Sequence, residues 1–276
     1  GVIGLGYVGL PLVFLYLKKK FNVIGFDKDT QKLKDLKKGK SYLSHISDQY
    51  LKKALKWNFR TSNNFKLINE TDIIILCLPT PLTSTLKPDL SYIKNTLTNI
   101  LPNLKKGQLI ILESSTYPGS TREIISDRLK KNKFNIGKNF FVGYSPERED
   151  PSNKKFTIEN IPKICSGISK NCTQLTKIIY SKIINKIVLV KNIETAEFTK
   201  IFENTFRSVN IALVNEMKIL CHKLKLNIFD IINAAKTKPF GFQPFYPGPG
   251  VGGHCIPVDP YYLSWLAKKK KIKLNF

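Results

Sequence analysis

A turn rich in glycine near the start of the chain constrains the fold more than any other feature. Its glycines, spaced as G-x-G-x-x-G, are Gly4, Gly6 and Gly9. The turn directly follows the apolar residues 2–3, and a helical pattern continues from it to Lys20. A second apolar segment, residues 22–26, ends at Asp27, 18 residues after the last glycine (27 − 9). Strand, glycine turn, helix and second strand in this order predict a β-α-β unit of a parallel sheet.

Each part of this unit has a use in binding a dinucleotide. Gly4 permits the tight turn, Gly6 lets the backbone approach a pyrophosphate, and Gly9 lets the helix pack on the strand. The phosphates would lie at the helix N-terminus, where free N–H groups favour anions. Asp27 would accept hydrogen bonds from the adenosine ribose and repel a 2′-phosphate, which favours NAD over NADP. FAD is disfavoured because no second flavin motif occurs, and a glycine turn without a cofactor is the structural alternative.

Strands and helices continue to alternate over the first half of the chain. After an irregular stretch, a continuous apolar run at 73–78 predicts a strand buried on both faces. The later strands are expected at 108–112 and 140–143, and the helices at 30–38, 89–101 and 120–130. This alternation predicts an α/β fold with a doubly wound parallel sheet of Rossmann type.

The pattern changes near residue 190. A long helical pattern runs from Thr195 through Lys225, followed by a shorter helix at 228–236. A loop rich in proline and glycine, residues 239–257, precedes a last helix that starts near Pro260. We therefore predict two domains: an NAD-binding domain at 1–190, and a helical domain at 191–276.

Charge is the outlying feature of the composition. The chain has 45 Lys and Arg against 20 Asp and Glu, a formal net charge of +25. Alone, this charge suggests nucleic acid or an anionic membrane surface as a partner. However, only five of the cations are arginine and the lysines are scattered, whereas proteins that read nucleic acid favour clustered arginine. We expect no nucleic-acid partner, and no membrane partner because no apolar run reaches about 18 residues.

The cysteines give no sign of a metal site or of a disulfide framework. There are five, an odd number, without a C-x-x-C pair or a His/Cys spacing typical of zinc. We expect reduced thiols in a cytoplasmic protein, and no metal.

One cysteine stands in a context that suggests chemistry. Cys255 lies in the glycine-rich segment 246–260, whose backbone amides could approach a bulky ligand. Beside a nicotinamide, a thiolate can capture an aldehyde as a thiohemiacetal, which a second oxidation converts to a thioester for hydrolysis. Asp259 precedes Pro260 as a helix N-cap would. It either caps that helix alone or also positions a catalytic water.

Six motifs along the chain occur in the same order in one known protein family. They are GLGYVGLP at 4–11, CLPTP at 77–81, ESSTYPGST at 113–121, SPER at 145–148, ENTFRSVN at 203–210 and GGHCIPVDP at 252–260. With these motifs, the chain resembles the UDP-glucose/GDP-mannose dehydrogenase family, NAD-dependent enzymes that oxidise C6 of nucleotide sugars. The resemblance runs from Gly1 to Phe276.

The resemblance implies a role for each matching residue. Cys255 would be the nucleophile, Lys200 would stabilise the developing oxyanion, and Asn204 would hold the oxygen being oxidised. Asp259 matches the family acid, and Glu147 matches an acid of the hydrolytic half-reaction. The remaining matches are Tyr7, Val8, Pro79, Thr80 and Thr116 for the cofactor, and Arg207, Tyr246, Gly250, Gly252 and Gly253 for the substrate.

Two departures from the family pattern bear on the chemistry. Pro151 replaces a second Glu that many relatives carry, so Glu149 or Asp150 could substitute as the general base. Many relatives have Lys before the family acid, where this chain has Val258. Together with Arg207, the His254–Cys255 pair and residues 238–250, this replacement looks most like members that oxidise UDP-N-acetylglucosamine. UDP-N-acetylmannosamine and UDP-glucose are the alternative substrates.

The resemblance also bears on completeness and assembly. By this resemblance, we expect residues 191–276 to be the central domain, through which the chain forms a homodimer. Family members continue into a C-terminal nucleotide-sugar domain, which we expect to lie outside this sequence. We expect the 276-residue chain to bind NAD but to turn over slowly. The alternatives to an active dehydrogenase are an inactive fragment and a basic nucleic-acid-binding protein.

Overall fold

A computed structural model gives the fold of the chain. The residues that it describes are 1–44, 46–149, 156–252 and 256–274. They form two compact units. The first unit comprises Gly1–Pro81 and Asp89–Phe198, and the second comprises Leu82–Pro88 and Thr199–Phe276, apart from the undescribed residues.

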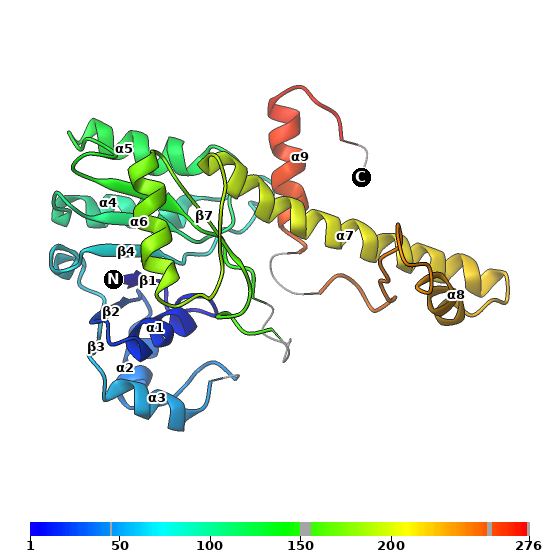
Figure 1. The fold of residues 1–276 in the computed structure, drawn as a ribbon, viewed down its shortest axis with the longest axis horizontal. Helices are drawn as coiled ribbons and strands as arrows, with labels where there is room; N and C mark the ends of the chain where they lie inside the picture. The colour runs from blue at the N-terminus through cyan, green and yellow to red at the C-terminus, as the bar shows by residue number, and fades with distance from the viewer. Residues whose placement is uncertain (45, 150–155, 253–255, 275–276) are drawn as a thin grey trace. The chain divides into compact units, whose positions relative to one another are not determined.

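A sheet with the strand order β3-β2-β1-β4-β5-β6-β7-β8 forms the centre of the first unit (Figure 1). The strands are β1 (Val2–Ile3), β2 (Val23–Phe26), β3 (Phe59–Ser62), β4 (Ile73–Leu76), β5 (Leu109–Leu112), β6 (Phe141–Tyr144), β7 (Lys163–Gly167) and β8 (Ile187–Leu189). Neighbouring strands are parallel, except that β7 runs antiparallel to β6. The strand order reverses at β1, between β2 and β4, and in such sheets ligands bind beyond the carboxyl ends of the strands at this point.

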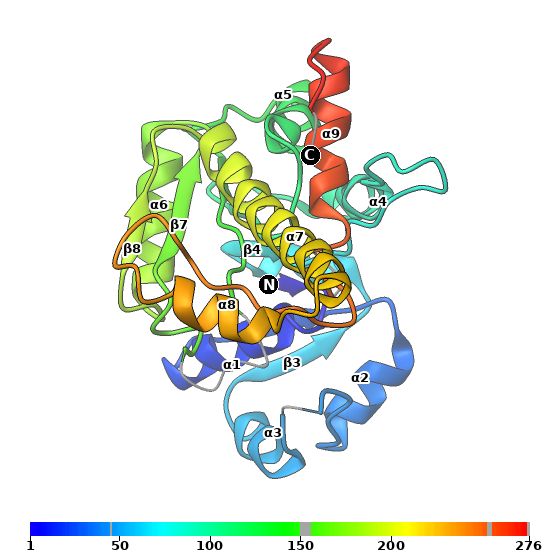
Figure 2. The same cartoon turned by 90° about the vertical axis from the view of Figure 1, so that its right-hand side faces the viewer.

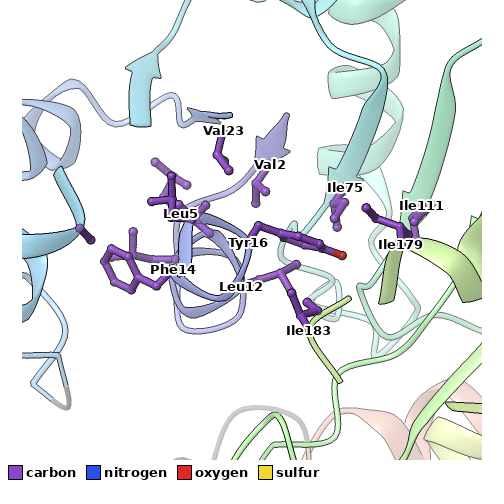
Figure 3. Close-up of a cluster of buried hydrophobic side chains, with 14 of the residues drawn as sticks. Val2, Leu5, Leu12, Phe14, Tyr16, Val23, Ile75, Ile111, Ile179 and Ile183 are labelled. Atoms are coloured by element: carbon purple, nitrogen blue, oxygen red, sulfur yellow. The ribbon is translucent and has the colours of Figure 1, made fainter. Parts of the chain in front are cut away.

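Helices pack around the sheet. They are α1 (Gly9–Lys18), α2 (Thr30–Lys37), α3 (Asp48–Leu55), η1 (Phe65–Glu70), α4 (Ser91–Ile100), η2 (Leu101–Asn103), η3 (Arg122–Ser126), α5 (Asp127–Lys131) and α6 (Lys170–Ser181). One buried cluster joins α1 and α6 to the sheet; within it, Tyr16 extends from α1 toward Ile75 and Ile179 (Figure 3). On α5, Arg128 donates hydrogen bonds to the Lys94 carbonyl and the Thr98 hydroxyl of α4, which ties these two helices together.

The second unit is helical. Its helices are α7 (Ile193–Lys223), which begins in the first unit, α8 (Ile228–Ala235) and α9 (Asp259–Lys269). Figure 2 shows α8 beside the end of α7, where Val214 and Cys221 pack with Ile228 and Ile232. Among the residues that the structure describes, no helix is both long and apolar enough to cross a membrane.

The predicted α/β fold with a doubly wound sheet followed by helices is confirmed, with three differences in detail. The sheet is not wholly parallel, because β7 reverses direction. The stretch expected to be irregular contains α3, β3 and η1; β3 is short and mostly half-exposed, so no apolar run marked it. The elements β7, α6 and β8 had no counterpart in the prediction, although Ser169 caps α6 by accepting from the Cys172 amide.

Candidate active site

Packing around the glycine turn explains two of its glycines from within the protein. Gly4 has a φ of +95°, and a Cβ there would lie 2.2 Å from the Cys77 carbonyl oxygen. A Cβ on Gly9 would lie 1.9 Å from the Gly4 carbonyl oxygen, so α1 could not approach the turn so closely. A Cβ on Gly6, by contrast, would meet nothing within 4 Å. The protein's own packing therefore requires Gly4 and Gly9, whereas Gly6 faces open space.

Asp27 lies against the turn, as its position after β2 predicts. Its Oδ2 accepts a hydrogen bond from the Leu5 amide at 2.9 Å, and its Oδ1 accepts one from the Asp29 amide at 3.0 Å. The Tyr42 hydroxyl donates to the Leu5 carbonyl at 2.5 Å. A carboxylate oxygen can accept two hydrogen bonds, so each oxygen of Asp27 retains capacity for a hydroxyl.

The loops after β4 and β5 meet at the same edge of the sheet. Ser114 joins them, because its hydroxyl donates to the Leu78 carbonyl at 2.7 Å and accepts from the Leu78 amide at 2.9 Å. Thr80 is half-buried and Pro79 exposed on one loop. On the other loop, Thr116 is fully buried, and its hydroxyl has no hydrogen-bond partner among the described residues. The open space at Gly6 and this unpartnered hydroxyl fit a dinucleotide at the edge, with the phosphates at the N-terminus of α1.

Tyr7 and Val8 complete the turn. Tyr7 is 53% exposed, and Val8 is the half-buried N-cap residue of α1. The Val8 side chain does not come within 4 Å of a Cβ built on Gly6. The turn thus offers mainly its backbone to a ligand.

A buried glutamate anchors the segment that carries Thr116. Glu197, near the start of α7, accepts hydrogen bonds from the Gly119 amide, the Ser120 hydroxyl, and the amide and hydroxyl of Thr121, at 2.6–3.0 Å. Burial raises the pKa of Glu197, and these donors oppose that rise. Because the carboxylate satisfies four donors at once, it fixes the turn after Thr116.

Within the second unit, the structure brings together three of the predicted catalytic residues. Lys200 and Asn204 lie one helical turn apart on α7, and the Asn204 amide Nδ2 donates to Asp259 Oδ2 at 2.5 Å. Asp259 is 1% exposed. Burial raises its pKa to about 6, against the Asn204 hydrogen bond and the Lys200 charge, which lower it. A carboxyl group in this state can bind or release a proton near neutral pH.

The prediction that Asp259 caps a helix is wrong. Helix α9 begins at Asp259 itself, its N-cap residue is Val258, and no side chain makes the capping hydrogen bond. The Asp259 carboxylate instead accepts from Asn204. The Asp-Pro pattern identified the start of the helix correctly but not the partner of the side chain.

The predicted substrate residues lie on α7 and on the loop after α8. Arg207 and Tyr246 are exposed, as are Gly250 and Gly252. The Gly248 amide of this loop donates to Asn215 Oδ1 at 3.0 Å. Gly253 and Cys255 lie outside the described residues, as does Asp150.

Glu147 belongs to a buried ionic cluster at the carboxyl edge of the sheet. Its Oε2 lies 2.9 Å from the Lys163 ammonium, which also lies 3.2 Å from Glu113 Oε1. The Glu147 Oε1 accepts from the amides of Arg148 and Glu149. Although burial raises the pKa of Glu147, Lys163 and these hydrogen bonds outweigh it, so the net shift is downward.

Comparison with known proteins identifies the family. Residues 1–184 match the NAD binding domain of the UDP-glucose/GDP-mannose dehydrogenase family, and residues 194–276 match the central domain of the same family. The chain belongs to this family. The nicotinamide cofactor that fits the glycine turn is accordingly NAD.

Similar proteins of the family are described as acting on different sugars. A UDP-N-acetyl-D-glucosamine 6-dehydrogenase of Pseudomonas aeruginosa is 37% identical, over 97% of this chain and 63% of its own length. A UDP-N-acetyl-D-mannosamine dehydrogenase of Methanococcus aeolicus is 40% identical, over 95% of this chain and 59% of its own. The solved structure of a UDP-D-ManNAc dehydrogenase from Pyrococcus horikoshii superposes with a TM-score of 0.91 at 32% identity, over 100% of this chain and 65% of that one. The chain spans about three fifths of the length of its curated relatives.

Some residues of this dehydrogenase-family site escaped the sequence analysis. Glu113 stands inside a recognised motif, and a buried acid directly after a strand could have drawn attention. Asn215, Glu197 and Lys163 had no local signal, because each acts through a partner at least 16 residues away along the chain. Only the tertiary fold brings these pairs together.

Proposed function

We propose that the complete gene product is an NAD-dependent nucleotide-sugar 6-dehydrogenase that oxidises the C6 hydroxymethyl group of UDP-N-acetylglucosamine to the carboxylate. The observation that carries the proposal is the Asn204–Asp259 hydrogen bond in the second unit, with Lys200 one turn earlier on the same helix. A cation, an amide and an acid with a raised pKa can together hold an alcohol oxygen, stabilise negative charge on it and take up its proton.

The first half of the chain supplies the cofactor site in this proposal. Residues 1–190 form the NAD-binding domain, with the phosphates over Gly4, Gly6 and Gly9, the ribose on Asp27, and the nicotinamide near Thr80 and Thr116. When bound, NAD⁺ supplies the hydride acceptor for both oxidation steps. Residues 191–276 form the central domain.

The proposed catalytic residues of the central domain then have separate roles. Asn204 holds the C6 oxygen, Lys200 stabilises negative charge on it, and Asp259 positions a water that relays the hydroxyl proton to the Asp259 carboxylate. Cys255 adds as a thiolate to the aldehyde carbon, and the resulting hemithioacetal becomes a thioester after the second oxidation. In the last step, the water oxygen bonds to the thioester carbon, its proton passes to Glu147, and the C–S bond breaks to release the thiolate.

The identity of the sugar is the finer part of the proposal. Arg207, Val258 and the loop at 238–250 favour UDP-N-acetylglucosamine, in agreement with the relative from P. aeruginosa. The 40% identity to the M. aeolicus relative favours UDP-N-acetylmannosamine as the second candidate. Arg207, Tyr246 and the glycines of the loop would contact the nucleotide sugar in either case.

We further propose a homodimer formed through the helices of the second unit. Large apolar side chains are exposed there, among them Phe202 at 56%, Leu213 at 53% and Leu220 at 48%. Exposed apolar surface of this extent along one helix is typical of an interface. Sedimentation of the complete gene product at two monomer masses would support the dimer.

The experiment that tests the function measures NADH release by the complete gene product with UDP-N-acetylglucosamine, UDP-N-acetylmannosamine and UDP-glucose. We expect the highest kcat/KM with the first sugar, and two NADH per sugar oxidised. Cys255→Ala should stop uronate formation, whereas Cys221→Ala, which changes a cysteine of the α7–α8 cluster, should retain it. Unchanged uronate formation by Cys255→Ala would contradict the mechanism. DNA affinity that falls steeply with salt would instead favour a nucleic-acid-binding protein.

A further inference from the structure

The most unusual group in the first unit is a lysine buried between two carboxylates. The Lys163 side chain is 3% exposed, and its ammonium lies 3.2 Å from Glu113 and 2.9 Å from Glu147. We infer that Lys163, held in place by Glu113, is a positioning residue that orients the Glu147 carboxylate for thioester hydrolysis. This inference rests on the proposed function, which assigns the hydrolytic proton to Glu147.

The reversed strand explains how a lysine reaches this edge of the sheet. Glu113 directly follows β5, and Glu147 comes three residues after β6, so both acids lie at the carboxyl edge. Lys163 is the first residue of β7, which pairs antiparallel with β6 through Tyr144 and Ser166. Antiparallel pairing places the start of β7 beside the end of β6. A parallel strand would have carried its first residue to the opposite edge.

Hydrogen bonds distinguish the two carboxylates. Glu147 accepts from Lys163 at one oxygen and from two backbone amides at the other. Glu113 accepts from Lys163 and from the Tyr180 hydroxyl at Oε1, while its buried Oε2 has no hydrogen-bond partner within the described ranges. The negative charge is therefore better stabilised on Glu147 than on Glu113.

The direction of each pKa shift agrees with this difference. Burial raises the pKa of Glu113, whereas the Lys163 charge and the hydrogen bonds bring the pKa of Glu147 below its usual value. The pKa of Lys163 is raised because both acids outweigh its burial. Tyr16, Cys77, Cys165 and Tyr180 also face this cluster, and burial raises the pKa of all four, so they stay neutral at pH 7. Two further charged residues are neighbours of the cluster: Arg148, whose guanidinium donates to the Pro162 carbonyl, and Glu149, whose amide donates to Glu147.

Exposure indicates which member of the cluster can meet a reactant. The Glu147 side chain keeps 15% of its surface exposed, against 3% for Lys163 and none for Glu113. Only Glu147 can therefore receive a proton from a water outside the cluster. Lys163 acts through Glu147, because it holds Oε2 in one place and keeps the carboxylate in the ionised form that accepts a proton.

The test separates hydrolysis from oxidation in the complete gene product, with NAD⁺ and UDP-N-acetylglucosamine. The variant is Lys163→Met combined with Glu113→Gln, since removal of the lysine alone would leave a second buried acid without its cation. We expect the first turnover to release two NADH per active site as in the unmodified protein, and the steady-state rate to fall about 100-fold. The thioester on Cys255 should accumulate and be detected by its mass in quenched samples.

The pH profile supplies a readout that a purely structural role would not move. Without the lysine charge, the pKa of Glu147 rises, so the acid limb of the steady-state rate should move upward by about 1–3 pH units. Lys163→Arg keeps the charge, and its acid limb should stay close to that of the unmodified protein. Lys18→Met, which breaks an exposed ion pair with Glu159, is the matched control and should change neither quantity.

The possible outcomes distinguish the inference from the function on which it rests. If the unmodified protein makes no NADH, the proposed function fails, and the inference fails with it. If it turns over normally while the double variant hydrolyses the thioester equally fast with the same acid limb, the inference alone is overturned. The same holds if the double variant only melts at a lower temperature, or if Lys163→Arg moves the acid limb as far as the double variant does.

Discussion

The glycine turn of the first unit and the Lys200–Asn204–Asp259 cluster of the second are built in different ways. The turn is shaped by backbone: Gly4 and Gly9 are required by carbonyl oxygens that a Cβ would strike. The cluster depends on side chains from two helices, joined by one hydrogen bond to a buried acid. A site made of backbone is sensitive to added volume, whereas a site made of side chains is sensitive to charge and protonation.

The largest effect is expected in the side-chain site. Asp259→Asn keeps the size of the side chain but removes the group that exchanges a proton near neutral pH. We expect kcat of the complete gene product to fall about 10²- to 10⁴-fold, while its NAD affinity stays the same. Steady-state NADH release and NAD titration check the two halves of this prediction, and a loss of kcat below ten-fold would argue against a proton-transfer role.

Stability should also depend on pH through Asp259. Its pKa is about 6 in the folded chain against an ordinary 3.8, so between these values the folded state binds more protons than the unfolded state. Stability therefore falls as pH rises from about 4 to about 6, by about 3 kcal/mol in total. Asp259→Asn lacks this loss. The free energy of unfolding of both proteins should be measured between pH 4 and 7. As pH rises, the value for the variant should increase relative to that of the unmodified protein, and a constant difference would contradict the raised pKa.

In the backbone site, Gly9→Ala should act through volume. The new Cβ would lie 1.9 Å from the Gly4 carbonyl oxygen, which cannot move without displacing the turn. We expect a loss of about 1–3 kcal/mol in the free energy of unfolding, together with weaker NAD binding. Denaturant unfolding and NAD titration measure these changes. A variant as stable as the unmodified protein would contradict the close contact between residue 9 and the Gly4 carbonyl.

Gly6→Ala sharpens the same comparison with the smallest effect. Apart from the adjacent residues in the chain, its Cβ would meet no atom within 4 Å, so the free energy of unfolding should change by less than about 0.5 kcal/mol. NAD affinity should still fall about ten-fold, equal to about 1.4 kcal/mol, because the methyl group occupies space that the pyrophosphate needs. Unchanged NAD affinity in this variant would remove Gly6 from the cofactor site.

The same contrast explains how much of the molecule could be predicted from its sequence. The glycine turn and Asp27 were predictable because their requirements are local: a positive φ, a close approach, and an acid after the next strand. The helix start at Asp259 was predictable for the same reason, but its hydrogen bond to Asn204 was not, since 55 residues separate them along the chain.

Elements without a strong local pattern also escaped prediction. The edge strand β3 alternates too weakly to stand out, and the reversal of β7 depends on its pairing with β6 rather than on its own residues. The reversal matters most for Lys163, because no sequence pattern places a lysine beside two acids. Neither the pairing nor the cluster could be deduced before the sheet was known.

The hydrogen bonds of Asp27 have a consequence for the kinetics of cofactor binding. Both carboxylate oxygens are held by the Leu5 and Asp29 amides of the protein itself, and Tyr42 holds the Leu5 carbonyl. A ribose hydroxyl therefore meets an acceptor whose rotamer is fixed before the encounter, so little conformational entropy is lost on association. NAD should accordingly bind in a single kinetic phase, without a slow rearrangement of the turn after the first contact.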